Sequence, residues 1–276
     1  MIILTQKEAQ SILKGEKRGS AFVSLDLGKT KTEVKIENGE VFLEETKVSL
    51  KELNKAKEHT CYTVENGELK SIELFSPETN LYYKLWFEKD WPTVMLSSVP
   101  MHRWKNTTPK NHALSIVNEI HPVKGRVLDT CCGLGYTATI AAKNGAESVD
   151  TFERDENVLA IAKYNPWSSE LFLGARIKIH PEDVLDGIKK FSDKTFDRII
   201  HDPPTPSFSP ELYEAKFYEN LFRVLKNRGI LYHYCPAPGK TKGKEFWVGV
   251  KRKLEEAGFS NVSYHERSSG IRALKK

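Results

Sequence analysis

One stretch of this sequence combines an acid with two nearby glycines at the end of a strand-like run. Asp129 closes the apolar run Arg126-Val-Leu-Asp, and Gly133 and Gly135 follow before a helical pattern begins. Glycine lets the backbone approach a ligand where a Cβ would collide, and open parallel sheets bind ligands beyond the carboxyl ends of their strands. Because residue 138 is alanine, the spacing differs from the dinucleotide pattern G-x-G-x-x-G. The turn therefore predicts a ligand site of another class.

A second acid lies twenty residues beyond the first glycine of this turn. Glu153 ends another strand-like run, and a carboxylate at this spacing can accept hydrogen bonds from both hydroxyls of a ribose. A solvated capping residue is the alternative for Glu153. Glu182 and Asp183 follow the third run, where they could reach an adenine amino group or cap the next helix. Together with the Asp129 turn, these acids favour a ligand that carries a nucleoside.

The fourth strand-like run ends in Asp202, which is followed by Pro203 and Pro204. An aromatic exocyclic amine is a weak nucleophile because its lone pair is delocalised into the ring. Asp202 and a proline carbonyl could accept hydrogen bonds from its two N–H groups, which would turn the lone pair toward a sulfonium methyl group. Positioning of the two reactants would then supply much of the rate. A rigid strand exit is the structural alternative. His201 could relay a proton or hold the substrate, or it could bond only to backbone.

The pattern of strand-like and helical runs differs between the two halves of the chain. Up to about Leu96 short alternating runs are separated by Asn38-Gly39 and Asn66-Gly67, a strong hairpin signal, with a short helix near 6–13. From about residue 111, strand-like runs alternate with helical patterns at 137–143, 157–164, 184–191, 212–225 and 245–257, which predicts a parallel sheet covered on both faces. We therefore expect a small β-rich domain over residues 1–98, a connector over 99–110 and an α/β domain over 111–276.

The composition is that of an ordinary globular protein. Hydrophobic residues make up 39% and charged residues 29% of the chain, which argues against wholesale disorder or a fibrous repeat. There is no apolar run of about 18 residues and no signal-peptide core, so we expect no membrane partner. Cys131 and Cys132 are adjacent, and the four cysteines form no C-x-x-C pair. We therefore expect a cytoplasmic protein without a disulfide framework or a bound metal.

The net charge of +5 arises near the end of the sequence. Residues 240–276 contain ten Lys and Arg against four acidic residues, whereas the preceding part contains 32 basic and 33 acidic residues. Such a segment is either the solvated face of a surface helix or a contact for phosphate. With the β-rich domain it favours structured RNA, tRNA first, as the partner, and a small amine is the alternative. The oligomeric state is not legible in the sequence.

At these residues the sequence resembles the class I S-adenosylmethionine-dependent methyltransferases. Asp129-Thr-Cys-Cys-Gly-Leu-Gly is similar to the first motif of that superfamily, Glu153 to the second, Asp183 to the third and Asp202-Pro-Pro to the fourth. The stretches Asn165-Pro-Trp-Ser and His233-Tyr-Cys-Pro-Ala-Pro-Gly-Lys also resemble a group of archaeal predicted methyltransferases. The resemblance covers roughly residue 101 to the C-terminus.

This resemblance implies a Rossmann-like sheet of seven strands with the last one antiparallel, and S-adenosyl-L-methionine as the methyl donor. It implies no particular substrate. It implies that the donor lies near a set of residues at the first three strand ends. These are Asp129, Thr130, Cys131, Gly133, Gly135, Tyr136, Glu153, Arg154, Glu182 and Asp183.

The acceptor side departs from the family pattern. Methyltransferases that act on base amino groups usually carry an aromatic residue after the prolines to stack on the base, but Thr205 occupies this position. Phe208 is the nearest aromatic residue, and Trp104 in the connector could belong to a lid. We therefore predict catalytic roles for Asp202, Pro203 and Pro204, and substrate contacts for His201, Phe208 and Trp104.

Three other functions remain open. Cys235 follows the fifth strand, where the RNA pyrimidine C5-methyltransferases that resemble this fold place a nucleophilic thiolate, although the usual Thr-Cys-Ser context is absent. Aminopropyl transfer to a polyamine uses a related sheet, a sulfonium donor and acids near the amine. A non-catalytic RNA-binding module could keep the donor turn, but it would be expected to lose Asp202. Because Asp202 is present, an enzyme is favoured.

Overall fold

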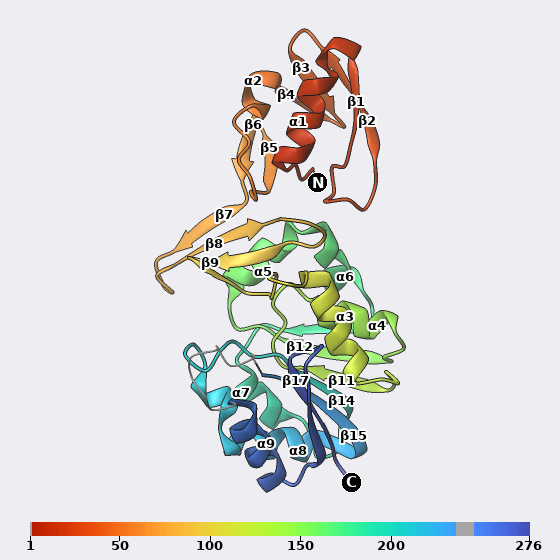
Figure 1. Ribbon diagram of the computed structural model, residues 1–276, viewed down its shortest axis with the longest axis vertical. Coiled ribbons are helices and arrows are strands. Elements are labelled where there is room, and N and C mark those ends of the chain that lie inside the picture. The colour runs from red at the N-terminus through yellow and green to blue at the C-terminus, as the bar shows by residue number, and fades with distance from the viewer. Residues whose placement is uncertain (1, 236–245) are drawn as a thin grey trace. The chain divides into compact units, whose positions relative to one another are not determined.

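The computed structural model describes residues 2–235 and 246–276 and divides into two compact units (Figure 1). The first unit comprises Met1–Lys110 and Asn157–Ser169, and the second comprises Asn111–Glu156 and Glu170–Lys276. The sequence places residues 157–169 within the α/β pattern, yet their contacts group them with the β-rich part. Contacts between segments far apart in sequence, rather than chain order alone, therefore determine how this unit is composed.

The first unit is built from antiparallel strand pairs. Its described residues form sheets with the orders β1-β2-β3-β4, β5-β6 and β10-β9-β8-β7. The predicted Asn-Gly hairpins are present: Asn38 and Gly39 have φ of 52° and 77°, and Asn66 and Gly67 have 52° and 79°, as a type I′ turn requires. The strands are β1 (Ser20–Val23), β2 (Thr32–Glu37), β3 (Glu40–Leu43), β4 (Thr46–Ser49), β5 (Tyr62–Glu65), β6 (Glu68–Ser71), β7 (Glu73–Ser76), β8 (Leu81–Trp86), β9 (Thr93–Leu96) and β10 (Val99–Pro100).

Two features of the first unit differ from the sequence-based expectation. Strand β10 pairs with β9, so residues 99–100 belong to a sheet rather than to a connector. Trp167 Nε1 donates to the carbonyl of Leu27 at 3.0 Å, and Lys29 Nζ donates to that of Pro166 at 3.0 Å, which joins residues 157–169 to this unit. Its helical elements are α1 (Gln6–Gly15), η1 (Glu16–Arg18), α2 (Leu50–Leu53), α5 (Glu156–Lys163, all but its first residue) and η2 (Pro166–Ser168).

The second unit contains the predicted seven-stranded sheet. The strand order is β13-β12-β11-β14-β15-β17-β16, and β17 is antiparallel to both of its neighbours while the first five strands are parallel. The chain leaves β11 toward β12 and β13 and then returns to the other side of β11 as β14, which makes the junction of β11 and β14 the switch point of the sheet. The strands are β11 (Arg126–Asp129), β12 (Ser148–Phe152), β13 (Ile177–His180), β14 (Phe196–His201), β15 (Leu225–Tyr234), β16 (Ser260–His265) and β17 (Gly270–Leu274).

Several expected helices of this unit are shorter or divided. The pattern at 184–191 forms one α-helical turn followed by a 3-10 turn, and the pattern at 212–225 breaks at Glu214, whose ψ of 151° is extended. Residue 245, the expected first residue of the last helix, lies outside the described residues. The helical elements are α3 (Pro109–Glu119), α4 (Tyr136–Lys143), α6 (Ser169–Leu173), α7 (Val184–Gly187), η3 (Ile188–Lys190), η4 (Pro210–Tyr213), α8 (Ala215–Val224) and α9 (Phe246–Glu256).

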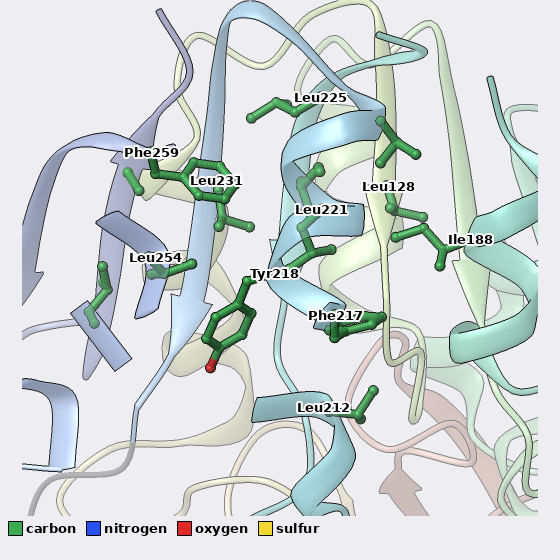
Figure 2. Close-up of a cluster of buried hydrophobic side chains, with 14 of the residues drawn as sticks. Leu128, Ile188, Leu212, Phe217, Tyr218, Leu221, Leu225, Leu231, Leu254 and Phe259 are labelled. Atoms are coloured by element: carbon green, nitrogen blue, oxygen red, sulfur yellow. The ribbon is translucent and has the colours of Figure 1, made fainter. Parts of the chain in front are cut away.

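The core of the second unit lies between one face of the sheet and helices α7, α8 and α9 (Figure 2). Leu221 of α8 is fully buried in the same cluster as Leu128 of β11, Leu231 of β15 and Leu254 of α9. Because side chains alternate along a strand, Asp129 points to the opposite face, where α4 contacts the sheet. Within residues 2–235 and 246–276, no helix is long and apolar enough to cross a membrane.

Replacing Leu221 by alanine tests this core. The substitution leaves a cavity in a fully buried cluster, so we expect the free energy of unfolding to fall by about 2–5 kcal/mol. Urea denaturation at constant pH measures the change. Leu173→Ala is the matched control, because Leu173 is 83% exposed and its truncation should change stability by less than about 0.5 kcal/mol. Equal effects of the two substitutions would show that the cluster is not packed as described.

Candidate active site

Two acids lie at the ends of neighbouring strands at the switch point. Asp129 is the last residue of β11, and Asp202 directly follows β14. Asp129 pairs with Ile200 across the two strands, and the next amide, that of Thr130, donates to the carbonyl of Ile200 at 3.0 Å. The negative charge of Asp202 contributes to raising the pKa of Asp129. The structure therefore brings the predicted donor acid and the predicted catalytic acid to one edge of the sheet.

The carboxylate of Asp129 is buried and only half satisfied. Its Oδ2 accepts hydrogen bonds from Thr137 Oγ1 at 3.0 Å and from Thr151 Oγ1 at 3.1 Å. Its Oδ1 is buried and has no hydrogen-bond partner among the described residues. Burial is the main cause that raises the pKa of Asp129 to about 7. A buried acceptor without a donor is destabilising, so this oxygen suits a ligand group that carries N–H protons.

Glu153 is directed back at the glycine turn. Its Oε2 accepts a hydrogen bond from the amide of Gly133 at 2.9 Å, and its Oε1 accepts one from the amide of Asp155 at 3.0 Å. Burial raises the pKa of Glu153 to about 7, although both backbone bonds act in the opposite direction. Each carboxylate oxygen keeps a second lone pair. The side chain can therefore accept two further hydrogen bonds, which suits the pair of hydroxyls of a ribose.

Gly135 owes its identity to packing within the protein. Its φ is +74°, and a Cβ added there would lie 2.6 Å from Cδ2 of Leu171 in α6. Leu171 already fills the space where a side chain at position 135 would lie. Packing within the protein therefore requires glycine here, whether or not a ligand also approaches its backbone. Cys131 is half-buried in the same turn and Tyr136 is buried at the first position of α4. Burial raises the pKa of the Cys131 thiol, so it stays neutral near pH 7.

The acids after β13 are engaged with the protein itself. Asp183 caps α7, with its Oδ1 accepting from the amide of Leu185 at 2.8 Å. Its Oδ2 accepts from Arg154 at 2.9 Å, and Glu182 pairs with Lys190. The bond between Asp183 and Leu185 corresponds to the capping alternative, whereas Glu182 forms an ion pair and no cap, and its contact with the donor stays a prediction.

Arg154 links two loops at the edge of the sheet. Besides Asp183, its guanidinium contacts Ser209 Oγ at 3.3 Å and Glu211 Oε1 at 3.6 Å. It therefore ties the loop that follows β13 to the one that follows β14. Nothing in the sequence indicated this connection, because its partners lie 29 to 57 residues away.

Residues 203–211, which we call the acceptor loop, follow Asp202. The hydroxyl of Tyr213 donates to the carbonyl of Pro204 at 2.9 Å. The carbonyl of Pro203 accepts no hydrogen bond from any residue that the structure describes. The amide of Phe208 donates to the carbonyl of Thr205 at 2.8 Å, and the Phe208 side chain is 50% exposed. The loop thus carries a half-exposed aromatic ring at Phe208, and the carbonyl of Pro203 directly follows Asp202 in the chain.

His201 is fully buried, and both of its ring nitrogens have protein partners. Its Nδ1 lies 2.7 Å from Thr130 Oγ1, and its Nε2 lies 3.1 Å from the carbonyl of Leu212. Burial, and less strongly His233, hold its pKa well below the usual value, so the ring is neutral. This placement corresponds to the alternative of a histidine bonded within the protein and not to a substrate contact. The sequence did not indicate Thr130 as its partner.

Cys235 and Trp104 are the other residues for which the sequence predicted a possible function. Cys235 is fully buried in the core of the second unit, and burial raises the pKa of its thiol, which opposes formation of a nucleophilic thiolate. Trp104 belongs to the first unit, where its ring packs 5.1 Å from that of Trp86. No group of three or more potential ligands that could hold a metal ion occurs between residues 2 and 235 or after 245.

The basic segment is described only in part. Residues 240–245, as well as 236–239 of the motif that begins at His233, lie outside the described residues. In α9, Lys251 and Arg252 pair with Glu255 and Glu256 at 3.7 and 3.6 Å. Lys253 donates to the carbonyl of Tyr213 at 2.9 Å, next to the acceptor loop. Two of the basic side chains of the segment are therefore paired with acids on the same helix.

Comparison with known proteins relates this geometry to one superfamily. Residues 113–232 match the family model described as methyltransferase small domain. The uncharacterized protein MJ1233 of Methanocaldococcus jannaschii is 41% identical over 284 residues, which cover all of this chain and 96% of that protein. A polyamine aminopropyltransferase of the same organism is 32% identical over 147 residues, or 51% of this chain and 48% of that protein.

A solved structure has a similar fold. A spermidine synthase in complex with the transition-state analogue AdoDATO superimposes with a TM-score of 0.58 at 20% identity, covering 74% of this chain and 73% of that chain. At this identity the likeness shows the fold alone. The strand order, the matched family model and the full-length likeness to MJ1233 lead to one assignment: the chain belongs to the class I S-adenosylmethionine-dependent methyltransferases, in the group that contains MJ1233.

Proposed function

We propose that this protein is an S-adenosylmethionine-dependent N-methyltransferase that acts on an exocyclic amine of a nucleobase, with RNA, tRNA first, as the substrate. The observation that carries this proposal is the position of Asp202. It precedes two prolines at the switch point, and its charge acts on the buried Asp129. The net basic charge of the C-terminal segment supports an acceptor rich in phosphate.

The residues of the switch point fit the donor. We assign Asp129 Oδ1, the buried oxygen without a partner, to the ammonium group of its methionine portion. Glu153 accepts the two ribose hydroxyls with its remaining lone pairs. When bound, S-adenosylmethionine supplies a methyl group activated by a sulfonium. The remaining predicted donor contacts are the turn residues Thr130, Cys131, Gly133, Gly135 and Tyr136 and, at the adenine side, Arg154, Glu182 and Asp183.

On the acceptor side, Asp202 and the carbonyl of Pro203 hold the amine. Each accepts a hydrogen bond from one N–H group of the substrate amine, which withdraws the nitrogen lone pair from the ring and directs it toward the donor. Asp202 then takes the proton that the nitrogen releases when it gains its methyl group. Phe208 supplies a half-exposed ring on which the base can stack. His201 has no substrate contact in this proposal, because both of its nitrogens bond within the protein.

Aminopropyl transfer to a polyamine is the second candidate. It is favoured by the 32% identity to a polyamine aminopropyltransferase and by the spermidine synthase fold. In that reaction Asp202 would take a proton from an aliphatic ammonium rather than hold an aromatic amine. The two reactions differ in the bond that breaks at the sulfonium, and their spent donors are therefore different compounds.

The identity of the spent donor decides between these reactions. We expect the purified protein, given labelled S-adenosylmethionine and separated cellular pools of RNA, protein and small molecules, to label RNA and release S-adenosylhomocysteine. Given decarboxylated S-adenosylmethionine and a polyamine, it should release no methylthioadenosine. Chromatography of the nucleoside products measures both outcomes. Methylthioadenosine as the main product would establish the second candidate and contradict the first.

Replacing Asp202 tests the proposed acceptor site. Because Asp202 holds the amine and takes its proton, Asp202→Ala should lower kcat about 10²–10⁴-fold. The affinity for S-adenosylhomocysteine, measured by calorimetry, should change by less than about threefold. Asp186→Ala is the matched control, because Asp186 is an exposed acid on α7. Unchanged turnover in Asp202→Ala would remove Asp202 from the mechanism.

The raised pKa values of Asp129 and Glu153 make donor binding depend on pH. Both pKa values lie at about 7, and only the ionised carboxylates can accept all the proposed hydrogen bonds. As the pH falls from 8 to 6 both groups gain protons, so the Kd for S-adenosylhomocysteine should rise about 100-fold. In Glu153→Gln only Asp129 titrates, so the rise should shrink to about tenfold from a weaker starting affinity. Equal Kd values at pH 6 and 8 in the unaltered protein would contradict the assignment.

A further inference from the structure

The imidazole of His201 connects the two halves of the proposed site. Its Nδ1 bonds to the hydroxyl of Thr130, the residue after Asp129, at 2.7 Å. Its Nε2 bonds at 3.1 Å to the carbonyl of Leu212, directly after the acceptor loop. One ring thus contacts the turn from 129 to 135, which we call the donor turn, and the residue that directly follows the acceptor loop.

The partners of the ring determine its tautomer. The carbonyl of Leu212 can only accept a hydrogen bond, so Nε2 carries the proton and donates it. A neutral imidazole then has an acceptor at Nδ1, and the hydroxyl of Thr130 donates to it. Burial keeps the ring neutral by lowering its pKa. Nδ1 therefore accepts a hydrogen bond from Thr130, and Nε2 donates one to the carbonyl of Leu212.

The surrounding core holds this ring in place. The centroid of the His233 ring lies 4.5 Å from that of His201, and the Phe217 ring lies at 5.2 Å. His233 is itself fixed, since its Nε2 accepts from the hydroxyl of Tyr218 at 2.9 Å and its Nδ1 donates to its neighbour's carbonyl at 2.7 Å. A displacement of either segment therefore breaks a buried hydrogen bond rather than being absorbed by rotation of the ring.

We propose that His201 is a positioning residue that links the donor turn to the acceptor loop, with one ring nitrogen for each. The effect of this link on catalysis rests on the proposed function, in which Asp202 and Pro203 hold the amine. Both residues directly follow His201 in the chain, so a shift of the acceptor loop would move them. A misplacement of about 1 Å between reacting groups can lower the rate about 10²-fold. The link would keep the two reactants in register without touching either of them.

Two amide side chains can separate the two roles. Asparagine at position 201 places an amide oxygen near the site of Nδ1, so it keeps the bond from Thr130 and loses the one to Leu212. Glutamine reaches the site of Nε2, so it keeps the bond to Leu212 and loses the one from Thr130. The two variants have similar chemistry and should cause opposite local effects.

His201→Asn should loosen the acceptor loop alone. In hydrogen-exchange mass spectrometry we expect faster exchange of the amides from 205 to 213 and unchanged exchange from 129 to 135. The Kd for S-adenosylhomocysteine should stay within about threefold, while kcat falls about 10–100-fold because the amine is misplaced. His201→Gln should give the reverse, with faster exchange in the donor turn and a Kd raised about tenfold because the turn must be ordered again on binding.

Substitutions at Thr130 test the same link independently. Thr130→Val removes the hydroxyl without changing the shape and should reproduce the effects of His201→Gln, whereas Thr130→Ser should restore the original behaviour. Tyr232→Phe is the matched control, because it removes a buried hydroxyl that donates to the carbonyl of Ser268 and leaves the bonds of His201, and those of His233 beside it, intact. If the variants at position 201 do not fold, the pair at position 130 decides the matter.

The proposal is overturned if His201→Asn and His201→Gln loosen both segments together, or if neither changes the exchange of either segment. It is also overturned if Thr130→Val and Thr130→Ser behave alike. The exchange measurements need neither donor nor acceptor. A protein that binds no S-adenosylhomocysteine would therefore contradict the proposed function and leave the test of the link intact.

Discussion

The parallel pairing of β11 with β14 is the interaction on which the rest of the site depends. It places Asp129 opposite Ile200, so two acids more than seventy residues apart in sequence emerge at one edge of the sheet. The pairing exists because the chain returns from β13 to the free side of β11. In the proposed reaction this crossover brings the donor and the amine together, since neither acid alone could hold both.

Burial gives these acids their chemical character. Asp129 and Glu153 are removed from water without a cationic side chain as their main partner, and hydroxyl and amide donors compensate only part of the loss of hydration. Such a site is stabilised by a ligand that brings its own donors and positive charge. Groups with strongly perturbed pKa values are common at functional sites, and in the proposed function these two carboxylates are where the donor gains binding free energy.

The positions of Asp129 and Glu153 at strand ends could be predicted from the sequence because their environment is local. Asp129 and Glu153 each end an apolar run, and the spacing between turn and acid depends on one helix and one strand. The partners of His201 could not be predicted, since Thr130 reaches it only through the register of two strands. The break at Glu214 was equally hidden, because helical spacing continues through it. The role of Asp183 could not be predicted for another reason: an aspartate suits both a helix cap and a ligand contact, and the sequence does not distinguish them.

The close approach of Gly135 to Leu171 constrains how this turn can change during evolution. A methyl group at position 135 would overlap the leucine side chain at 2.6 Å, and the φ of +74° disfavours any side chain there. A smaller residue at 171 would relieve the overlap but would leave the backbone strain. The constraint is therefore one-sided. Substitutions at position 171 can be tolerated while residue 135 is glycine, whereas no substitution at 171 makes a side chain at 135 acceptable.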